Sequence, residues 1–129
     1  MGSKVKSKMQ RIDFKKYLPD DFPEELLVYG RDLCSGIGIN EIAWSYPAVL
    51  KIIEFLHENS YVILGGDVYY NSQDKLNSLG DSWYIKDNEI LSESGKNKAI
   101  GYIEDYVHFN GSNYFFSLVL SKKESMNDR

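Results

Sequence analysis

The chain has 129 residues, of which 43% are hydrophobic and 26% are charged, and its formal net charge is −4. This length and composition are typical of one soluble domain with its own core, and a single cysteine, Cys34, excludes an intrachain disulfide. No apolar run approaches the roughly 18 residues of a membrane-spanning helix, and no apolar signal segment follows the basic N-terminus, so we expect a cytoplasmic protein without a membrane partner.

The first segment of the chain, residues 1–16, is basic. It carries six basic side chains and one acid, a net +5, so residues 17–129 carry −9. A body of that charge repels nucleic-acid phosphates, which argues against a nucleic-acid partner. It suits a basic protein partner, or it simply keeps the domain soluble. We expect residues 1–16 to be flexible, residues 17–121 to form a single domain, and residues 122–129 to be a disordered tail.

The first expected element is a helix from about residue 20 to Cys34. Acidic residues and Pro23 mark its first turn, where carboxylates favour the helix dipole and proline fits the backbone. Its apolar face follows spacings of four, three and four residues: Phe22, Leu26, Tyr29 and Leu33. Residues 39–44 are interpreted as an apolar connector with one helical turn.

A second helix is expected from Ser45 to residue 58, with Ser45 as its cap and Pro47 in its first turn. The apolar face of this segment is wide. We therefore expect it to be the central buried helix, with Ile53 and Leu56 in the core. Replacing either side chain by alanine should cost about 2–5 kcal/mol of unfolding free energy.

The strand-rich half begins with the apolar run 61–64, which resumes as a strand at 68–70 after two glycines. Residues 71–80 are polar and predict a loop, and residues 83–85 predict a short strand.

A third helix is expected over 98–109, because apolar residues recur there at helical spacing and Gly111 stands at the position of a C-terminal cap. The last strand is expected at 114–121. The order α-α-β-β-α-β predicts an α+β fold, in which helices pack on a small mixed or antiparallel sheet.

The most informative segment is Gly65-Gly66-Asp67, where an apolar strand breaks at two glycines and a carboxylate follows. Glycine reaches backbone angles that other residues avoid, so the chain can turn or bulge here. The carboxylate of Asp67 either accepts hydrogen bonds from freed backbone N–H groups or is presented to a partner. We favour the structural role, which predicts that Asp67→Asn lowers stability by about 1 kcal/mol.

Catalytic and metal signatures are weak. Gly36-Ile37-Gly38 lacks the third glycine of a dinucleotide fingerprint and would follow a helix rather than a strand. His57 and His108 fall in the last turns of expected helices, without the spacing of a zinc site. Cys34 is interpreted as a buried small hydrophobe. The acidic residues of the second half match no calcium loop. We expect no catalytic residue, no cofactor and no metal.

Tyrosine is frequent, with ten residues, and most of them lie in the strand-rich half. Tyrosine and tryptophan bury a large rigid area and keep a polar tip, which suits both a protein interface and the edge of a small core. The candidate partner-binding residues surround the glycine break: Asp67, Tyr69, Tyr70, Asp81, Trp83 and Tyr84.

Several segments together carry a family resemblance: Gly65-Gly66-Asp67-Val68-Tyr69, Trp83-Tyr84, Ala99-Ile100-Gly101-Tyr102-Ile103 and Tyr114-Phe115-Phe116-Ser117-Leu118-Val119. With Ala43 and Leu50-Lys51-Ile52-Ile53 before them, the chain resembles the immunity protein 40 family of bacterial polymorphic toxin systems over about residues 34–120. The resemblance implies a small α+β protein that binds and neutralises a cognate toxin in the producing cell. It implies no catalytic residues and no cofactor.

Two alternatives stay open at this point. A small-ligand-binding protein or enzyme would use the Gly65–Asp67 break as a pocket wall, with a base and a donor converging on Asp67. A structural interaction module with another partner would need no pocket. A flat or ridged surface of aromatic and acidic residues would favour the immunity protein instead.

Overall fold

The computed structural model describes residues 18, 21–32, 42–73, 75–86 and 93–122. Six strands of this part form one antiparallel sheet in the order β1-β2-β5-β3-β4, and β6 continues beside β3 beyond β5. The strands are β1 (Gly30–Asp32), β2 (Ile42–Ser45), β3 (Tyr61–Ser72), β4 (Lys75–Tyr84), β5 (Tyr114–Ser117) and β6 (Val119–Lys122).

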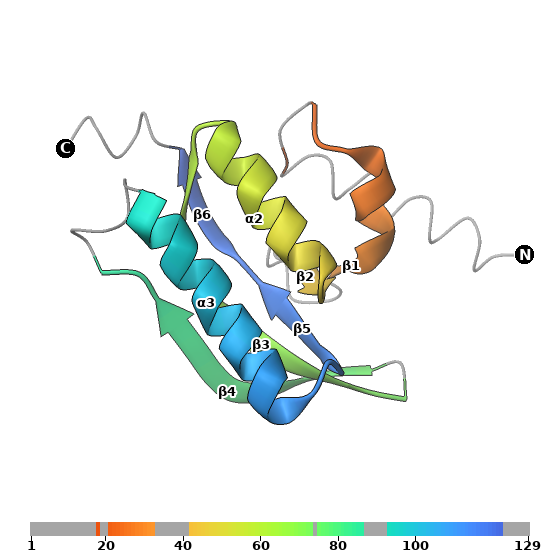
Figure 1. Cartoon of the computed structure of the whole chain (residues 1–129). Coiled ribbons are helices and arrows are strands. Elements are labelled where there is room, and N and C mark those ends of the chain that lie inside the picture. The colour runs from red at the N-terminus through yellow and green to blue at the C-terminus, as the bar shows by residue number, and fades with distance from the viewer. Residues whose placement is uncertain (1–17, 19–20, 33–41, 74, 87–92, 123–129) are drawn as a thin grey trace, which may run out of the picture.

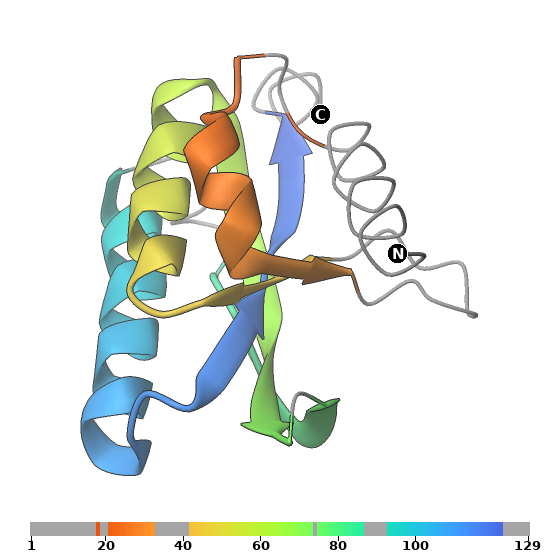
Figure 2. The same ribbon diagram turned by 90° about the vertical axis from the view of Figure 1, so that its right-hand side faces the viewer.

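The helices are η1 (Glu24–Tyr29, a 3-10 helix), α2 (Ala48–Glu58) and α3 (Glu93–Asn110). Helices α2 and α3 lie side by side over one face of the sheet (Figure 1), and the view from the side shows η1 beside α2 (Figure 2). None of the helices in the described residues is both long and apolar enough to cross a membrane.

The expected α+β class and the packing of helices on an antiparallel sheet are confirmed. The expected element order is wrong, because the chain runs η1-β1-β2-α2-β3-β4-α3-β5-β6. The two longer helices cover most of their expected ranges, although α2 begins at Ala48 and α3 begins earlier than expected, at Glu93. Gly111 has a positive φ of 93° directly after α3, as a helix-ending residue requires.

The expected extent of the first helix is wrong. Among the described residues of this range, only Glu24–Tyr29 is helical, and the chain then enters β1, which pairs with β2 through Gly30 and Trp44. A Cβ atom on Gly30 would lie 2.7 Å from Cζ3 of Trp44, so the glycine makes room for the indole. Pairing with a distant strand therefore overrides the local helical spacing. Leu33 and Cys34 lie outside the described residues, as do residues 1–17 and 123–129.

Three further expectations are corrected by strand pairing. Residues 42–44, expected in a connector, form β2 with Ser45, between β1 and β5. Ser45 is therefore not the cap of the second helix, and α2 begins at Ala48 with Pro47 in the N-cap position. Residues 71–80, expected as a loop, belong mostly to the β3–β4 hairpin, where Ser72 pairs with Lys75. The described residues of this hairpin end are mostly exposed, so their polarity reflects solvent contact rather than a loop. The last strand is interrupted at Leu118 and forms β5 and β6.

The core lies between the sheet and the two long helices. Its fully buried side chains come from α2, α3 and the centre of the sheet: Val49, Ile52, Ile53, Leu56, Val68, Ile103 and Phe116. Ile53 and Leu56 are 0% and 1% exposed, which confirms α2 as the central buried helix. Strand β5 lies between β2 and β3, so Phe116 sits at the middle of this core although it comes late in the chain.

Candidate functional site

The glycine break is a place of close approach between neighbouring strands. Gly65 and Gly66 lie opposite Tyr84 and Trp83 in the β3–β4 ladder, and β3 passes through them without ending. A Cβ atom on Gly66 would overlap the carbonyl oxygen of Ser117 and lie 3.0 Å from Cζ2 of Trp83. The pairing register shifts on both sides of the break, so the expected bulge is present and the glycines let three strands meet.

The freed backbone group at the break is satisfied from β5. The N–H of Asp67 donates a hydrogen bond of 3.1 Å to Oγ of Ser117, whose side chain is 1% exposed. No hydrogen bond of the Asp67 carboxylate occurs among the described residues. The Ser117 hydroxyl therefore takes the structural role that was expected of that carboxylate, and residues 67 and 117 are too far apart along the chain for any local pattern to connect them.

Strand alternation divides the six candidate residues between two faces of the sheet. Trp83 stacks on Tyr102 of α3 and Asp81 bonds to Tyr106, so both lie on the helix-covered face. Tyr70 contacts Tyr114 on the same face. The candidates on the other face are Asp67, Tyr69 and Tyr84, because each neighbours a residue that points toward the helices.

The helix-covered face carries a continuous row of rings, which we call the aromatic array: Trp83, Tyr102, Tyr106, Tyr114 and Tyr70. Successive ring centroids along it are 5.2, 6.0, 5.1 and 5.3 Å apart. The row runs between α3 and the strands, where it fixes the helix to the sheet edge. Sequence reasoning missed three of its members as site residues, although Tyr102 and Tyr106 are four residues apart on one helix, a spacing that places them on one face.

Asp81 ties β4 to α3 at the surface. The hydroxyl of Tyr106 donates a 2.8 Å hydrogen bond to Oδ2 of Asp81. Burial raises the pKa of Tyr106 above its ordinary value, and this hydrogen bond raises it further. Burial and the charge of Asp81 also raise the pKa of Tyr102. Both phenols therefore stay neutral well above neutral pH, and Tyr106 keeps its role as a donor.

The candidate residues differ widely in exposure. The side chain of Tyr84 is 80% exposed and that of Tyr70 is 37% exposed, whereas Trp83 is 8% exposed. Asp81 is exposed at the same sheet edge. Tyr84 and Asp81 are thus accessible from opposite faces of β4, whereas the ring of Trp83 is buried beneath α3.

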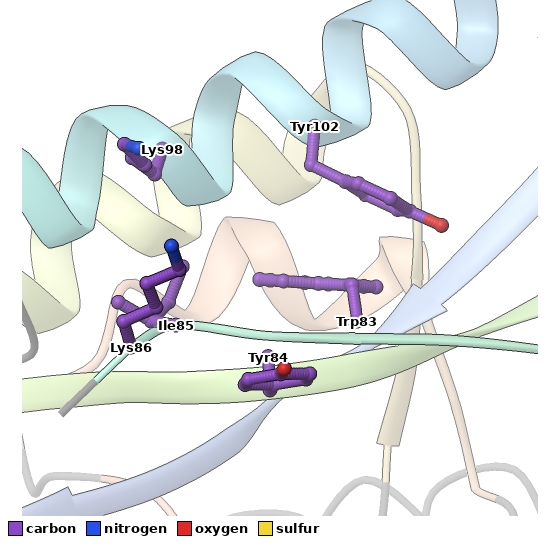
Figure 3. A pocket seen from close by; sticks show the side chains of 6 residues that line it. All are labelled: Trp83, Tyr84, Ile85, Lys86, Lys98 and Tyr102. Carbon is purple, nitrogen blue, oxygen red and sulfur yellow. The ribbon is translucent and has the colours of Figure 1, made fainter.

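A pocket of about 230 Å³ opens beside Trp83, at the end of the edge strand β4. It lies between this strand and the first half of α3 (Figure 3). The residues that line it are Trp83, Tyr84, Ile85, Lys86, Lys98 and Tyr102. Asp67 is not among them, so this pocket does not bring a base and a donor together at Asp67, as the enzyme alternative requires. Within the described part of the chain, no group of three or more His, Cys, Asp and Glu side chains is placed to hold a metal ion.

A comparison with family models matches residues 33–120 to immunity protein 40. A search of curated proteins and a search of solved structures each gave no match. The matched range covers more than half of the chain and runs from before β2 into β6, so it includes the glycine break, the aromatic array and the pocket. The chain therefore belongs to the immunity protein 40 family.

Proposed function

We propose that this protein binds and neutralises one cognate toxin domain in the cytoplasm of the producing cell, without any turnover of its own. The observation that carries the proposal is the family match over residues 33–120. An immunity protein acts by occupying its toxin, so it needs a stable and specific surface rather than a catalytic constellation.

The surface that we propose for the toxin is the β4 edge, defined by Asp81, Tyr84 and the pocket beside Trp83. Among the described strands, β4 pairs only with β3, so its outer side is open to a partner. As an edge strand, β4 can present residues from both of its faces to the same partner. The 80% exposed ring of Tyr84 is an aromatic anchor of the kind that dominates protein interfaces.

Charge supports a basic toxin as the partner. The −9 charge of residues 17–129 attracts a basic surface over a distance and speeds its capture. Such steering acts mainly on the association rate and weakens as salt rises. We therefore expect slower association, rather than loss of the complex, at high ionic strength.

The test is co-expression with the toxin domain encoded beside this chain, followed by titration calorimetry at two salt concentrations. The expected results are rescued growth and a complex that tightens at low salt. Tyr84→Ala should weaken the affinity about 30-fold, the equivalent of roughly 2 kcal/mol at an interface centre. Tyr29→Ala is the matched control, since Tyr29 is 48% exposed but lies on η1, before the opposite edge strand β1. No rescue together with no binding at micromolar concentration would sink the proposal.

A further inference from the structure

We infer that an extended segment of the toxin pairs with the outer edge of β4 at residues 82–85 and adds a strand to the sheet. Pairing of this kind takes its affinity from main-chain hydrogen bonds and its specificity from pockets that receive alternate side chains. The inference rests on the proposed function and names the way in which the toxin engages the β4 edge. Among the described strands β4 is the last beside β3, and Figure 1 shows it at the border of the sheet.

Two hydrogen bonds determine which backbone groups of β4 point outward. The N–H of Ile85 donates to the carbonyl oxygen of Leu64 at 2.9 Å, so Ile85 faces β3. The N–H of Asp67 donates to a side chain of β5 and thus points away from its opposite residue, Ser82. The backbone groups of successive residues alternate between the two sides of an antiparallel strand. The N–H and C=O groups of Ser82 and Tyr84 therefore point outward, where another strand finds donors and acceptors.

The two halves of the β4 edge differ in how they receive another strand. In the first half, the register shift leaves residues 79–81 opposite Val68, and Gly80 takes a positive φ of 77°. Bulges of this kind, and charged residues such as Lys75, are devices by which edge strands avoid further pairing. Residues 82–85 carry no charged side chain, and 82–84 pair with β3 without a shift. A strand added at 82–85 therefore meets a regular edge and buries no charge of β4.

The pocket beside Trp83 lies along this regular part of the edge. Its lining includes Trp83 and Tyr84, whose rings lie on opposite sides of β4 (Figure 3). A cavity bordered by neighbouring residues of opposite faces reaches the edge of the strand itself. Directly paired residues lie on the same face, so a toxin residue opposite Trp83 or Ile85 points toward α3 and into the pocket. A toxin residue opposite Tyr84 packs against its 80% exposed ring.

The walls of the pocket select an apolar side chain. Trp83, Tyr102 and Ile85 form its apolar part, and the first two rings stack at 5.2 Å before any partner arrives. Such a preformed wall reduces the ordering that binding requires. The exposed Lys86 and Lys98 complete the lining, and lysine stems flank apolar groups while their charges stay in water. The volume of about 230 Å³ is below the roughly 300–1,000 Å³ of cofactor sites and suits one side chain.

The first experiment is hydrogen exchange, measured by NMR on this protein alone and with an inactivated variant of the toxin domain encoded beside it. In the free protein, the outward amides of Ser82 and Tyr84 should exchange faster than the inward amides of Trp83 and Ile85. In the complex, exchange at Ser82 and Tyr84 should slow about 10-fold or more. On the toxin, protection should appear at every second amide of one segment, because only one side of the added strand faces β4.

A proline variant tests the same contact through affinity. Ser82→Pro removes an outward N–H and keeps the ladder with β3, as proline at an edge strand does. It should weaken the affinity about 10-fold or more in titration calorimetry. Ser82→Ala keeps the N–H and should weaken binding clearly less. Thermal melts of all variants check that each one folds.

Ser78→Pro is the matched control in the first half of β4. Ser78 is also an exposed serine. The N–H of Asn71 bonds to Asn113, away from the opposite Leu76, so the backbone groups of Leu76 and of Ser78 point outward too. Because the inferred strand does not reach this half, Ser78→Pro should change the affinity by no more than about twofold.

The outcomes separate the two proposals. A complex in which Ser82 and Tyr84 exchange as fast as in the free protein, or a folded Ser82→Pro that binds as tightly as the parent, overturns strand pairing and leaves the immunity function standing. A free protein that is dimeric, with both amides already slow, also overturns it, because a second copy then covers the edge. A parent protein that does not bind overturns the proposed function, and the inference with it. Slowed exchange at both amides, with selective loss of affinity in Ser82→Pro, supports both.

Discussion

Helices α2 and α3 cover the same face of one sheet, yet they do so with different chemistry. The 11-residue α2 buries five residues, all apolar: Ala48, Val49, Ile52, Ile53 and Leu56. The 18-residue α3 buries only three: Gly95, Ala99 and Ile103. Instead of a wide apolar face, α3 brings the rings of Tyr102 and Tyr106 onto the sheet edge, with their hydroxyls near Asp81.

We propose that this difference separates stability from recognition within a small domain. The α2 side is closed and apolar, so its contribution comes from area removed from water. The α3 side keeps polar tips and a pocket at the surface. This arrangement contributes less to the free energy of unfolding, but it leaves groups for a partner.

The largest expected effects fall in α2. Ile53→Ala and Leu56→Ala should each cost about 2–5 kcal/mol of unfolding free energy, because both side chains are essentially unexposed. Ile100→Ala in α3 should cost clearly less, since Ile100 is only partly buried. Urea denaturation measures all three. Equal losses for Ile53 and Ile100 would contradict the division.

The glycine break should respond almost as strongly. Gly66→Ala forces β3 away from Ser117 and Trp83, and overpacking of this kind costs about 1–3 kcal/mol. Gly101→Ala is the matched control within α3. A Cβ atom there meets nothing within 4 Å, so the variant should gain about 0.5–1 kcal/mol from helix propensity. In thermal melts we expect a lower melting temperature for Gly66→Ala and a higher one for Gly101→Ala.

The hydrogen bond between Tyr106 and Asp81 gives a smaller and pH-dependent effect. At pH 7, Tyr106→Phe should lose about 1 kcal/mol. The folded state raises the pKa of Tyr106 above 10.0, so the unfolded chain loses its phenolic proton first as the pH rises. The stabilisation is thus fully present below pH 10 and declines above it. In denaturation curves, the difference in unfolding free energy between the parent and Tyr106→Phe should narrow above pH 10. Tyr29→Phe should have the same unfolding free energy as the parent at each pH.

The last pair of variants concerns residue 67, where one effect of similar size and one smaller effect are expected. Ser117→Ala should cost about 1 kcal/mol, because it leaves the N–H of Asp67 without its acceptor. Asp67→Asn should stay within about 0.5 kcal/mol of the parent, as a substitution away from any such contact does. If Asp67→Asn melts like the parent yet loses protection against the toxin, Asp67 is a contact with the partner.

The sequence allowed the two long helices to be placed because their apolar residues repeat at helical spacing over many residues. The strands at the ends of the sheet were missed for a different reason. Ile42–Ser45 and Gly30–Asp32 are short, and their strand character comes from pairing with each other and with β5. The polar β3–β4 hairpin end has no wide apolar face to mark it. Non-local pairing of this kind leaves little local signal.

The candidate site was predicted in part for related reasons. The residues around the glycine break are visible in the sequence, and Asp81, Trp83 and Tyr84 do gather at the β4 edge. Which of them face the helices depends on the strand register, because a shift of one residue would move each side chain to the opposite face of the sheet. Lys86 and Lys98 were missed because the pocket joins two elements that are separated along the chain. No spacing rule connects such lysines before the fold is known.

The central position of β5 has a consequence for synthesis. Residues 114–117 fill the gap between β2 and β3, so a nascent chain that ends before them has neither its middle strand nor Phe116. Its sheet would then consist of two separated parts with open edges. At ribosomal speeds of about 5–20 residues per second, the finished fold can appear only after this late segment has left the exit tunnel. Protection in the cell is therefore expected to begin only when translation has passed this strand, and prematurely terminated products should be cleared by proteases.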